Sequence, residues 1–505
     1  MELLRKWRLR KIATIATISL VLVILLPLCY LIRQIINLIL KLYYGKYYGG
    51  ILENADCMWA AESDINQCVT ILHIYKTSIK NPGDFINRVK DSHSKIFKDC
   101  FPKITSILKT FMGYGYLVKN QVSSDEAVRI VTVGSYHSDY LEESDLPRII
   151  NIIASRPLQK GLIEIHLVPK PLKRKTRDVT EWHYAVVYKV HHIVGEGLGL
   201  LMFCMESFAD DQVKVKEFKS KLSQRFSGKT NNRSCLSKRL KHYLASVMLI
   251  LKLPSFVSNQ FKKDLKHARS VRNADNVALK GANLIYAIES EDQKSLSKLM
   301  EIKRISGATV SSVILAAICR AMKDNSTATV PQSLEVAVVA LAQFPDLNLN
   351  AATLKNKYAS GGILNLPVLD SSTKDTLKLI NGAIDVLKKS NEVQMNYIIF
   401  NYIFEQIPLP ILRRILSVNR TTACLSSIPG PQKLTFFGGL ELVDVVGFLG
   451  LPSYLEIGFC VLTYDDRLHI GITCTKGSHS KAGLKKITES IFKYIDEMYR
   501  EVCTF

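Results

Sequence analysis

The chain has 505 residues, of which 47% are hydrophobic and 22% are charged. Apolar residues this plentiful exclude general disorder, and a single long apolar stretch argues against a multi-span transporter. Lysine and arginine number 67 against 45 for aspartate and glutamate, a net charge of +22, which predicts an anionic partner.

The first predicted element is a membrane segment. Residues 12–32 carry no charge, and a helix of this length spans roughly 30 Å, the thickness of a bilayer core. The run is longer than the apolar region of a cleaved signal peptide, which is the alternative. Residues 34–48 are rich in tyrosine and also contain lysines, as is typical of a segment in the headgroup zone. Pro27 either kinks the helix or turns it back as a hairpin. We expect residues 1–48 to anchor the protein in the endoplasmic reticulum or plasma membrane.

Two features favour opposite topologies for this anchor. Basic residues precede the apolar run, which favours a cytosolic N-terminus and, for a simple span, a remainder outside the cytosol. The 11 cysteines are dispersed without CxxC spacing, which predicts reduced thiols and neither a metal nor a redox site. A monotopic or re-entrant segment would be consistent with both the basic flank and the reduced cysteines. The sequence therefore leaves two alternatives, a single-pass anchor and a monotopic one.

After residue 49 the chain alternates short strand and helix patterns. The clearest strands are expected at 162–168, 184–190, 455–463 and 467–475, and the clearest helices at 293–304, 310–322 and 481–502. The Tyr464-Asp465-Asp466 run predicts a turn between the last two strands. This order favours an α/β (α+β) fold with large mixed sheets.

A strongly basic segment lies in the middle of the chain. Residues 214–272 hold 16 lysines and arginines and 2 acidic residues, around an apolar helical pattern at 243–253 that Pro254 is expected to end. The segment is either a solvated linker or a second contact with anionic lipid headgroups. Nucleic acid is not expected as a partner, because no recognition motif accompanies the charge.

The best candidate for chemistry is the run KVHHIVGEG, which ends at Gly197. His191 and His192 end a predicted strand, where a histidine can project into a cleft as a general base. Glu196 could hold the loop through a local ion pair, and Gly197 would permit a tight or left-handed turn. Without further context, His191 and His192 could also be two histidines at a strand end that have no catalytic role.

The run resembles the HHxxxDG signature of the CoA-dependent acyltransferase superfamily. Six further blocks, in order from about residue 50 to 500, resemble the wax ester synthase/diacylglycerol acyltransferase family. They are LENADCMWAAE at 52–62, RPL at 156–158 with IEIHL at 163–167, SGATV at 306–310, NKY at 356–358 with LPV at 366–368, SSIPGP at 426–431, and the strand pair at 458–475.

The resemblance implies a two-lobed fold with a tunnel at the lobe interface. The implied units are the anchor (1–48), an N-terminal lobe (49–213), a basic crossover linker (214–275) and a C-terminal lobe (276–505). It also implies acyl transfer from acyl-CoA, with no bound cofactor, to a fatty alcohol or diacylglycerol, giving a wax ester or triacylglycerol.

The resemblance further assigns roles to single residues. His192 would be the general base, while His191 and Glu196 would support the loop; Trp59 is expected to be a packing residue. Two departures stand out: Glu196 replaces an aspartate, and Ser311-Ser312 replace an Asn-Asp pair.

A serine hydroxyl can donate to an oxyanion, so Ser311, Ser312, Ser426 and Ser427 are candidate oxyanion or tunnel residues. The serine departure also motivates an alternative, a lipid-binding or barrier protein that keeps the fold without turnover.

Overall fold

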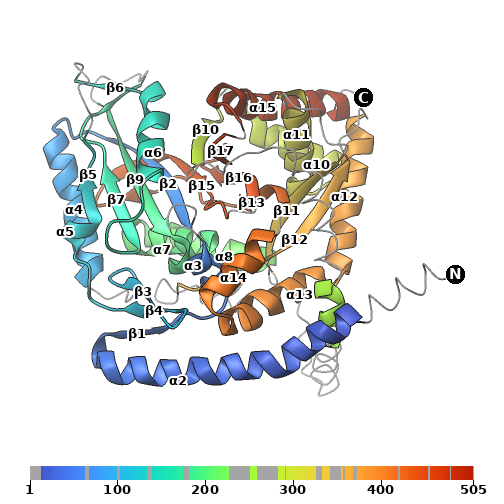
Figure 1. The fold of residues 1–505 in the computed structure, drawn as a ribbon. Helices are drawn as coiled ribbons and strands as arrows, with labels where there is room; N and C mark the ends of the chain where they lie inside the picture. Colours follow the sequence, from blue (N-terminus) through green and yellow to red (C-terminus); the bar gives the residue numbers. More distant parts are fainter. Residues whose placement is uncertain are drawn as a thin grey trace.

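The computed structural model describes residues 13–62, 67–98, 103–132, 139–174, 181–226, 251–258, 282–290, 292–325, 333–341, 354–356, 359–367, 372–418, 421–452, 455–477 and 479–503. Within these ranges the chain forms two lobes, each built on a mixed sheet, with a long N-terminal helix along the underside (Figure 1).

In the described part of the chain, eight strands form the first sheet. Its main path is β14–β15–β2–β9–β7–β5, with β6 and β8 beside it. The strands are β2 (Cys68–Thr77), β5 (Val128–Ile130), β6 (Leu141–Glu142), β7 (Ile163–Leu167), β8 (Leu172–Lys173), β9 (Trp182–His191), β14 (Thr435–Phe436) and β15 (Leu440–Phe448). β5 pairs parallel with β7, and β6 with β8; the other pairs are antiparallel.

Helices cover both faces of this sheet, which is why β9 is buried almost throughout. On one face, Phe85 of α4 (Pro82–Lys98) stacks on Tyr184 of β9 with ring centroids 4.3 Å apart. On the other face, the apolar side of α6 (Leu146–Ala154) joins Ala185 and Val187 in a second core. Alternate residues of β9 therefore face different layers, as strand geometry requires. The lobe also contains α3 (Asp56–Ala61), α5 (Ser124–Ala127), α7 (Gly197–Phe208) and α8 (Gln212–Phe226).

Six strands within the described ranges form the second sheet, in the order β10–β17–β16–β13–β11–β12. They are β10 (Ala282–Ile288), β11 (Ser333–Leu341), β12 (Ala359–Pro367), β13 (Thr421–Ile428), β16 (Leu455–Tyr464) and β17 (Arg467–Thr475). β13 runs parallel to both β11 and β16, and the remaining pairs are antiparallel. The helices of this lobe are α10 (Ser295–Ser306), α11 (Val310–Asn325), α12 (Thr373–Lys389), α13 (Glu392–Ile398), α14 (Leu409–Val418) and α15 (Lys481–Cys503).

The predicted elements are confirmed where the structure describes them. β7, β9, β16, β17, α10, α11 and α15 match the expected ranges to within three residues at each end. Asp465 and Asp466 form the two-residue turn between β16 and β17, with φ of +48° and +55°, as a type I′ hairpin needs. One expectation was wrong: residues 251–258 are helical, so Pro254 does not end a helix there. The rest of the basic segment, residues 227–250 and 259–272, lies outside the described residues.

The two lobes are joined by β15, which comes from the C-terminal half of the chain but pairs with β2 of the first sheet. It passes so close to the second sheet that a Cβ on Gly471 would meet the carbonyl oxygen of Gly447 at 2.1 Å. Only glycine permits this approach.

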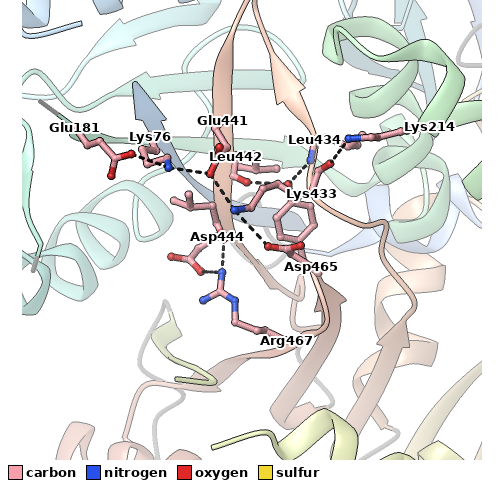
Figure 2. Close-up of polar contacts among 12 residues, drawn as sticks. Lys76, Glu181, Lys214, Lys433, Leu434, Glu441, Leu442, Asp444, Asp465 and Arg467 are labelled. Atoms are coloured by element: carbon pink, nitrogen blue, oxygen red, sulfur yellow. Dashed lines mark hydrogen bonds and ion pairs between the residues drawn. The ribbon is translucent and has the colours of Figure 1, made fainter. Parts of the chain in front are cut away.

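A buried carboxylate reinforces this junction. Asp444 of β15, 1% exposed, lies 2.7 Å from Arg174 and 2.8 Å from Arg467, and His469 Nε2 is 3.3 Å away. Burial by itself would raise the pKa of Asp444, but His469 and the two guanidinium groups hold it well below its usual range. Figure 2 shows Asp444 and Arg467 beside a more exposed chain of contacts through Lys76, Glu441, Lys433 and Asp465.

A small third sheet supports the N-terminal helix. β1 (Tyr48–Ile51), β4 (Tyr114–Val118) and β3 (Ile107–Phe111) pair in that order. The helix Ala13–Tyr47 includes a π-helical turn, Val21–Leu25, followed by α2 (Leu26–Tyr44). Pro27 lies inside this continuous helix, two residues after the π-helical turn, and the chain does not fold back there as a hairpin.

Candidate active site

A cavity of about 700 Å³ lies between the lobes, and residues from both sheets line it. Its walls are mostly aliphatic and aromatic, supplied by β2, β9 and α7 on one side and by β11, β12, β13 and the α13 region on the other. A cavity of this size and lining is typical of a site for an apolar small molecule.

His192 lies at the wall of this cavity because of strand alternation. Tyr188 and Val190 of β9 line the cavity, and His192 has the same parity just past the end of the strand. His191 has the opposite parity and is absent from the lining. The backbone N–H of His192 donates to the Gln67 carbonyl oxygen (2.7 Å), which fixes the chain at the point where β9 gives way to the 3₁₀ turn η4 (His192–Val194).

The His192 ring is held against an aromatic partner. Trp59 of α3 stacks on it with ring centroids 3.7 Å apart and an interplanar angle of 8°. Trp59 also lines the cavity. The expectation that Trp59 only packs at the lobe entrance therefore needs correction, because its indole faces both His192 and the cavity.

A polar cluster holds the histidine loop, residues 191–197, from outside. Asp56 is buried and lies 2.9 Å from the Lys103 ammonium, which also donates to the Ile193 carbonyl oxygen (2.7 Å). Asn356 donates through Nδ2 both to Asp56 Oδ1 (2.8 Å) and to the His192 carbonyl oxygen (2.6 Å). Asn356 lies between β11 and β12, so the C-terminal lobe fixes the loop that the N-terminal lobe carries.

Burial controls the protonation of this site. It lowers the pKa of His192 to about 4, against smaller opposing effects of its own backbone and of Asn356. His192 is therefore neutral at pH 7, the state in which an imidazole can accept a proton. Burial also raises the pKa of Asp56, while Lys103 and Asn356 act in the opposite direction.

The other loop residues have mainly structural surroundings. His191 is 4% exposed, and its Nδ1 accepts a hydrogen bond from the Ile193 N–H (3.1 Å). Glu196 is the N-cap residue of α7 and lines the cavity. Gly197 begins α7 and has no positive φ, so of the tight or left-handed turn that glycine would permit there, the left-handed form is wrong. A Cβ at this position would lie 2.7 Å from Cδ1 of Ile428, so the end of that side chain would have to shift to admit a larger residue.

The four candidate serines fall into two groups. Ser426 and Ser427 of β13 line the cavity, whereas Ser311 and Ser312 are absent from its lining. Ser312 is fully buried at the start of α11, where its hydroxyl contacts Thr309 Oγ1 (2.6 Å) and Asn381 of α12. The structure therefore places the Ser311-Ser312 pair in the packing of the second lobe and away from the cavity.

Sequence reasoning missed the cluster around the histidine loop. Asp56 and Asn356 lie in two of the resembling blocks, yet their spacing of 300 residues gives no sign that they meet. Lys103 lies in none of the blocks. The one available signal was Asp56 within its apolar segment, because an acidic residue that becomes buried requires a partner.

Comparisons with known proteins agree with this architecture. Residues 358–498 match the family model of the WS/DGAT C-terminal domain. The fold is similar to the wax ester synthase/diacylglycerol acyltransferase from Marinobacter aquaeolei VT8, with a TM-score of 0.54 at 14% identity over 88% of this chain and 98% of that one.

Two further solved structures have the same fold. The trichothecene 15-O-acetyltransferase from Fusarium sporotrichioides gives a TM-score of 0.57 at 11% identity, covering 89% of this chain and 94% of that one. The first condensation domain of the calcium-dependent antibiotic synthetase gives 0.52 at 12% identity, covering 90% and 97%. A comparison with curated proteins gives no match.

The fold is thus that of the condensation-domain-like acyltransferases, and the predicted two-lobed α/β class is confirmed. Residues 358–498 match the model of the WS/DGAT C-terminal domain, which confirms the resemblance seen in the sequence over this part of the chain.

Proposed function

We propose that this protein transfers a fatty acyl group from acyl-CoA to the hydroxyl of a fatty alcohol or diacylglycerol. The observation that carries the proposal is His192, neutral and stacked on Trp59, on the wall of an apolar cavity of about 700 Å³ shared by both lobes. His73 and His93 also line this cavity, but their Nδ1 atoms contact the Tyr75 hydroxyl and the Val89 carbonyl oxygen. An apolar cavity suits the two lipid chains, and a neutral imidazole suits proton transfer.

The proposed reaction needs no covalent enzyme intermediate. His192 takes the proton of the acceptor hydroxyl while the oxygen attacks the thioester carbonyl carbon. The tetrahedral intermediate collapses with cleavage of the C–S bond, and the coenzyme A thiolate takes the proton back from His192. The products are an ester and free coenzyme A.

The walls of the cavity supply the rest of the mechanism. Stacking on Trp59 and the hydrogen bond from Asn356 to the His192 backbone restrict the base to one orientation. Ser426 and Ser427, which line the same cavity, are our candidates for the oxyanion donor. Because Ser311 and Ser312 lie away from the cavity, their departure from the family pattern gives no reason to expect lost turnover.

The experiment compares microsomes that contain the parent chain, His192→Ala or His166→Ala. His166 is the matched control, a strand histidine paired with Glu164 and absent from the cavity lining. Each sample receives labelled long-chain acyl-CoA with fatty alcohol and diacylglycerol. We expect ester from the parent and from His166→Ala, and a loss of roughly 100-fold or more in His192→Ala, the usual contribution of a general base. Ester formation that survives in His192→Ala would overturn the role of the base, and no ester from any folded sample would favour the lipid-binding alternative.

A further inference from the structure

The N-terminal helix lies lengthwise against the globular body. Arg33 is 5% exposed and donates through Nη2 to the Leu52 carbonyl oxygen (2.8 Å). Ile36 and Leu40 are buried in a small core with residues of β1 and β4. The Tyr114 hydroxyl donates to the Gln406 carbonyl oxygen (3.1 Å) and lies 3.4 Å from that of Cys29. One face of α2 is therefore docked from Cys29 to Tyr44, about 24 Å at 1.5 Å per residue.

The opposite face of the helix is apolar and exposed. Leu28, Ile35 and Leu42 follow one another at intervals of seven residues and are 51%, 59% and 77% exposed. Other exposed side chains of this helix are Leu20, Val23, Ile24, Leu25, Tyr30, Leu31, Leu38, Ile39 and Tyr43. Exposed apolar surface of this extent marks a contact with a partner or a membrane.

The flanking charges identify that partner as a lipid surface. From residue 13 to 47 the chain has no acidic residue, and its charged groups are Arg33, Lys41 and Lys46. The Lys46 ammonium lies over the Tyr47 ring, and Lys109 of β3 over the Tyr44 ring, 5.3 and 5.7 Å from the centroids. Tyrosines with lysines at one end of an apolar helix match the interface between hydrocarbon and anionic headgroups.

The docked face decides how the helix lies in the membrane. If α2 crossed the bilayer, the third sheet that packs along it would lie at the depth of the hydrocarbon. That sheet is open, with β1 and β3 at its two edges, and unpaired strand edges are not tolerated in lipid. A helix parallel to the surface avoids this cost, because only its outward face enters the hydrocarbon.

The same helix forms part of the cavity wall. Thr17, Ile18 and Leu22 line the cavity together with Phe256 and Val257 of the helical residues 251–258. Figure 1 shows the N-terminal helix beneath the body, with its first turns close to α13 and residues 251–258. A lipid that leaves the hydrocarbon at this point would reach the cavity without crossing water.

We propose that residues 13–47 form an in-plane membrane helix and that the acceptor lipid enters the cavity from the bilayer beside Thr17, Ile18 and Leu22. The entry route rests on the proposed function, while the orientation of the helix does not. The two parts therefore receive separate experiments.

Orientation is measured on the full chain in vesicles of phosphatidylcholine and phosphatidylserine. A nitroxide amino acid replaces Leu28, Ile35 or Leu42, and its depth is read from collisions with oxygen and with a water-soluble nickel complex. We expect the three depths to agree to within a few ångström. A steady gradient of about 21 Å between positions 28 and 42, the rise of 14 residues, would show a spanning helix and overturn the proposal. This readout needs no enzymatic activity.

Entry is measured by substrate competition in the same vesicles. Ile18→Trp narrows the cavity wall, and Ile24→Trp, on the exposed face at 55%, is the matched control. We expect Ile18→Trp to lower kcat/KM for a long-chain alcohol dissolved in the bilayer at least tenfold more than for a short water-soluble alcohol. Equal loss for both alcohols, or no loss for either, would overturn the entry route. Absence of ester from the parent protein would instead refute the proposed function.

Discussion

Removing the Asn356 side chain should uncouple the histidine loop from the C-terminal lobe. Asn356→Ala deletes one Nδ2 group that donates to two buried acceptors, the Asp56 carboxylate and the His192 carbonyl oxygen. Lys103 still reaches Asp56 and Ile193, so part of the cluster survives. The perturbation is therefore local, and the chain is expected to fold.

The expected magnitude follows from the two orphaned acceptors. A buried acceptor left without its donor costs about 1–3 kcal/mol, so two acceptors give a loss of roughly 2–6 kcal/mol in the free energy of unfolding. The effect on turnover should be larger in relative terms. A shift of about 1 Å in a reacting group can lower the rate roughly 100-fold, and the His192 backbone loses its contact with the other lobe.

The assay measures kcat/KM for ester formation and thermal unfolding on the same preparations. Asn401→Ala is the matched control: Asn401 is 1% exposed and donates to the Tyr397 carbonyl oxygen of its own helical segment (2.9 Å). We expect both variants to lose stability and only Asn356→Ala to lose roughly 100-fold in kcat/KM. A folded Asn356→Ala protein with the kinetics of Asn401→Ala would refute the reasoning.

Three further predictions concern pH and the lobe junction. Because burial lowers the pKa of His192 to about 4 and the base must be unprotonated, log(kcat/KM) should stay level through pH 6.5 and fall only near 4; an inflection near 6.5 would contradict this. Acid should also destabilise the fold. Burial lowers the pKa values of five histidines from 6.5 to about 3 or 4 in the folded protein. As the pH falls below 6.5, the unfolded state therefore binds protons before the folded state does. The free energy of unfolding decreases by up to about 1.4 kcal/mol per pH unit for each histidine. Chemical denaturation at several pH values measures this loss, and a flat profile between 6.5 and 4 would refute it. Asp444→Ala leaves Arg174 and Arg467 without their shared carboxylate and should lower the free energy of unfolding by about 3–5 kcal/mol. The control is Asp385→Ala, which removes an exposed ion pair with Lys388 and should change the free energy of unfolding little in the same denaturation assay.

The sequence predicted much of the fold because the signals are local. A run of β-branched and aromatic residues marks β9, and a period of 3.6 marks α15, whose buried side chains include Leu484, Ile487 and Ile491. The Asp465-Asp466 turn was visible for the same reason, since two consecutive positive φ angles favour aspartate, asparagine or glycine.

The candidate site was predictable only in part. His192 followed from a motif within nine residues, and strand parity then places it at the cavity while His191 points away. The spacing of the candidate serines gave no sign of which ones would line the cavity. Ser426 and Ser427 line it, whereas Ser312 hydrogen-bonds within the second lobe. Sequence order alone could not separate them, because Ser311 and Ser312 begin α11 and Ser426 and Ser427 end β13, and only the packing of the lobes decides which element faces the cavity.

The amino-acid sequence by itself determined the class of fold, the apolar N-terminal helix and the histidine that faces the cavity. The fold class and the helix depend on periodicity and composition over short stretches, which the backbone geometry of helices and strands converts directly into structure, whereas the choice of His192 rested on the resemblance of its motif to the HHxxxDG signature. The tertiary structure alone decided that Asp56, Lys103 and Asn356 meet around His192 and that the N-terminal helix docks along the body. Contacts between residues up to 300 positions apart depend on how whole lobes pack, and a buried polar group finds its partner only when that packing is complete.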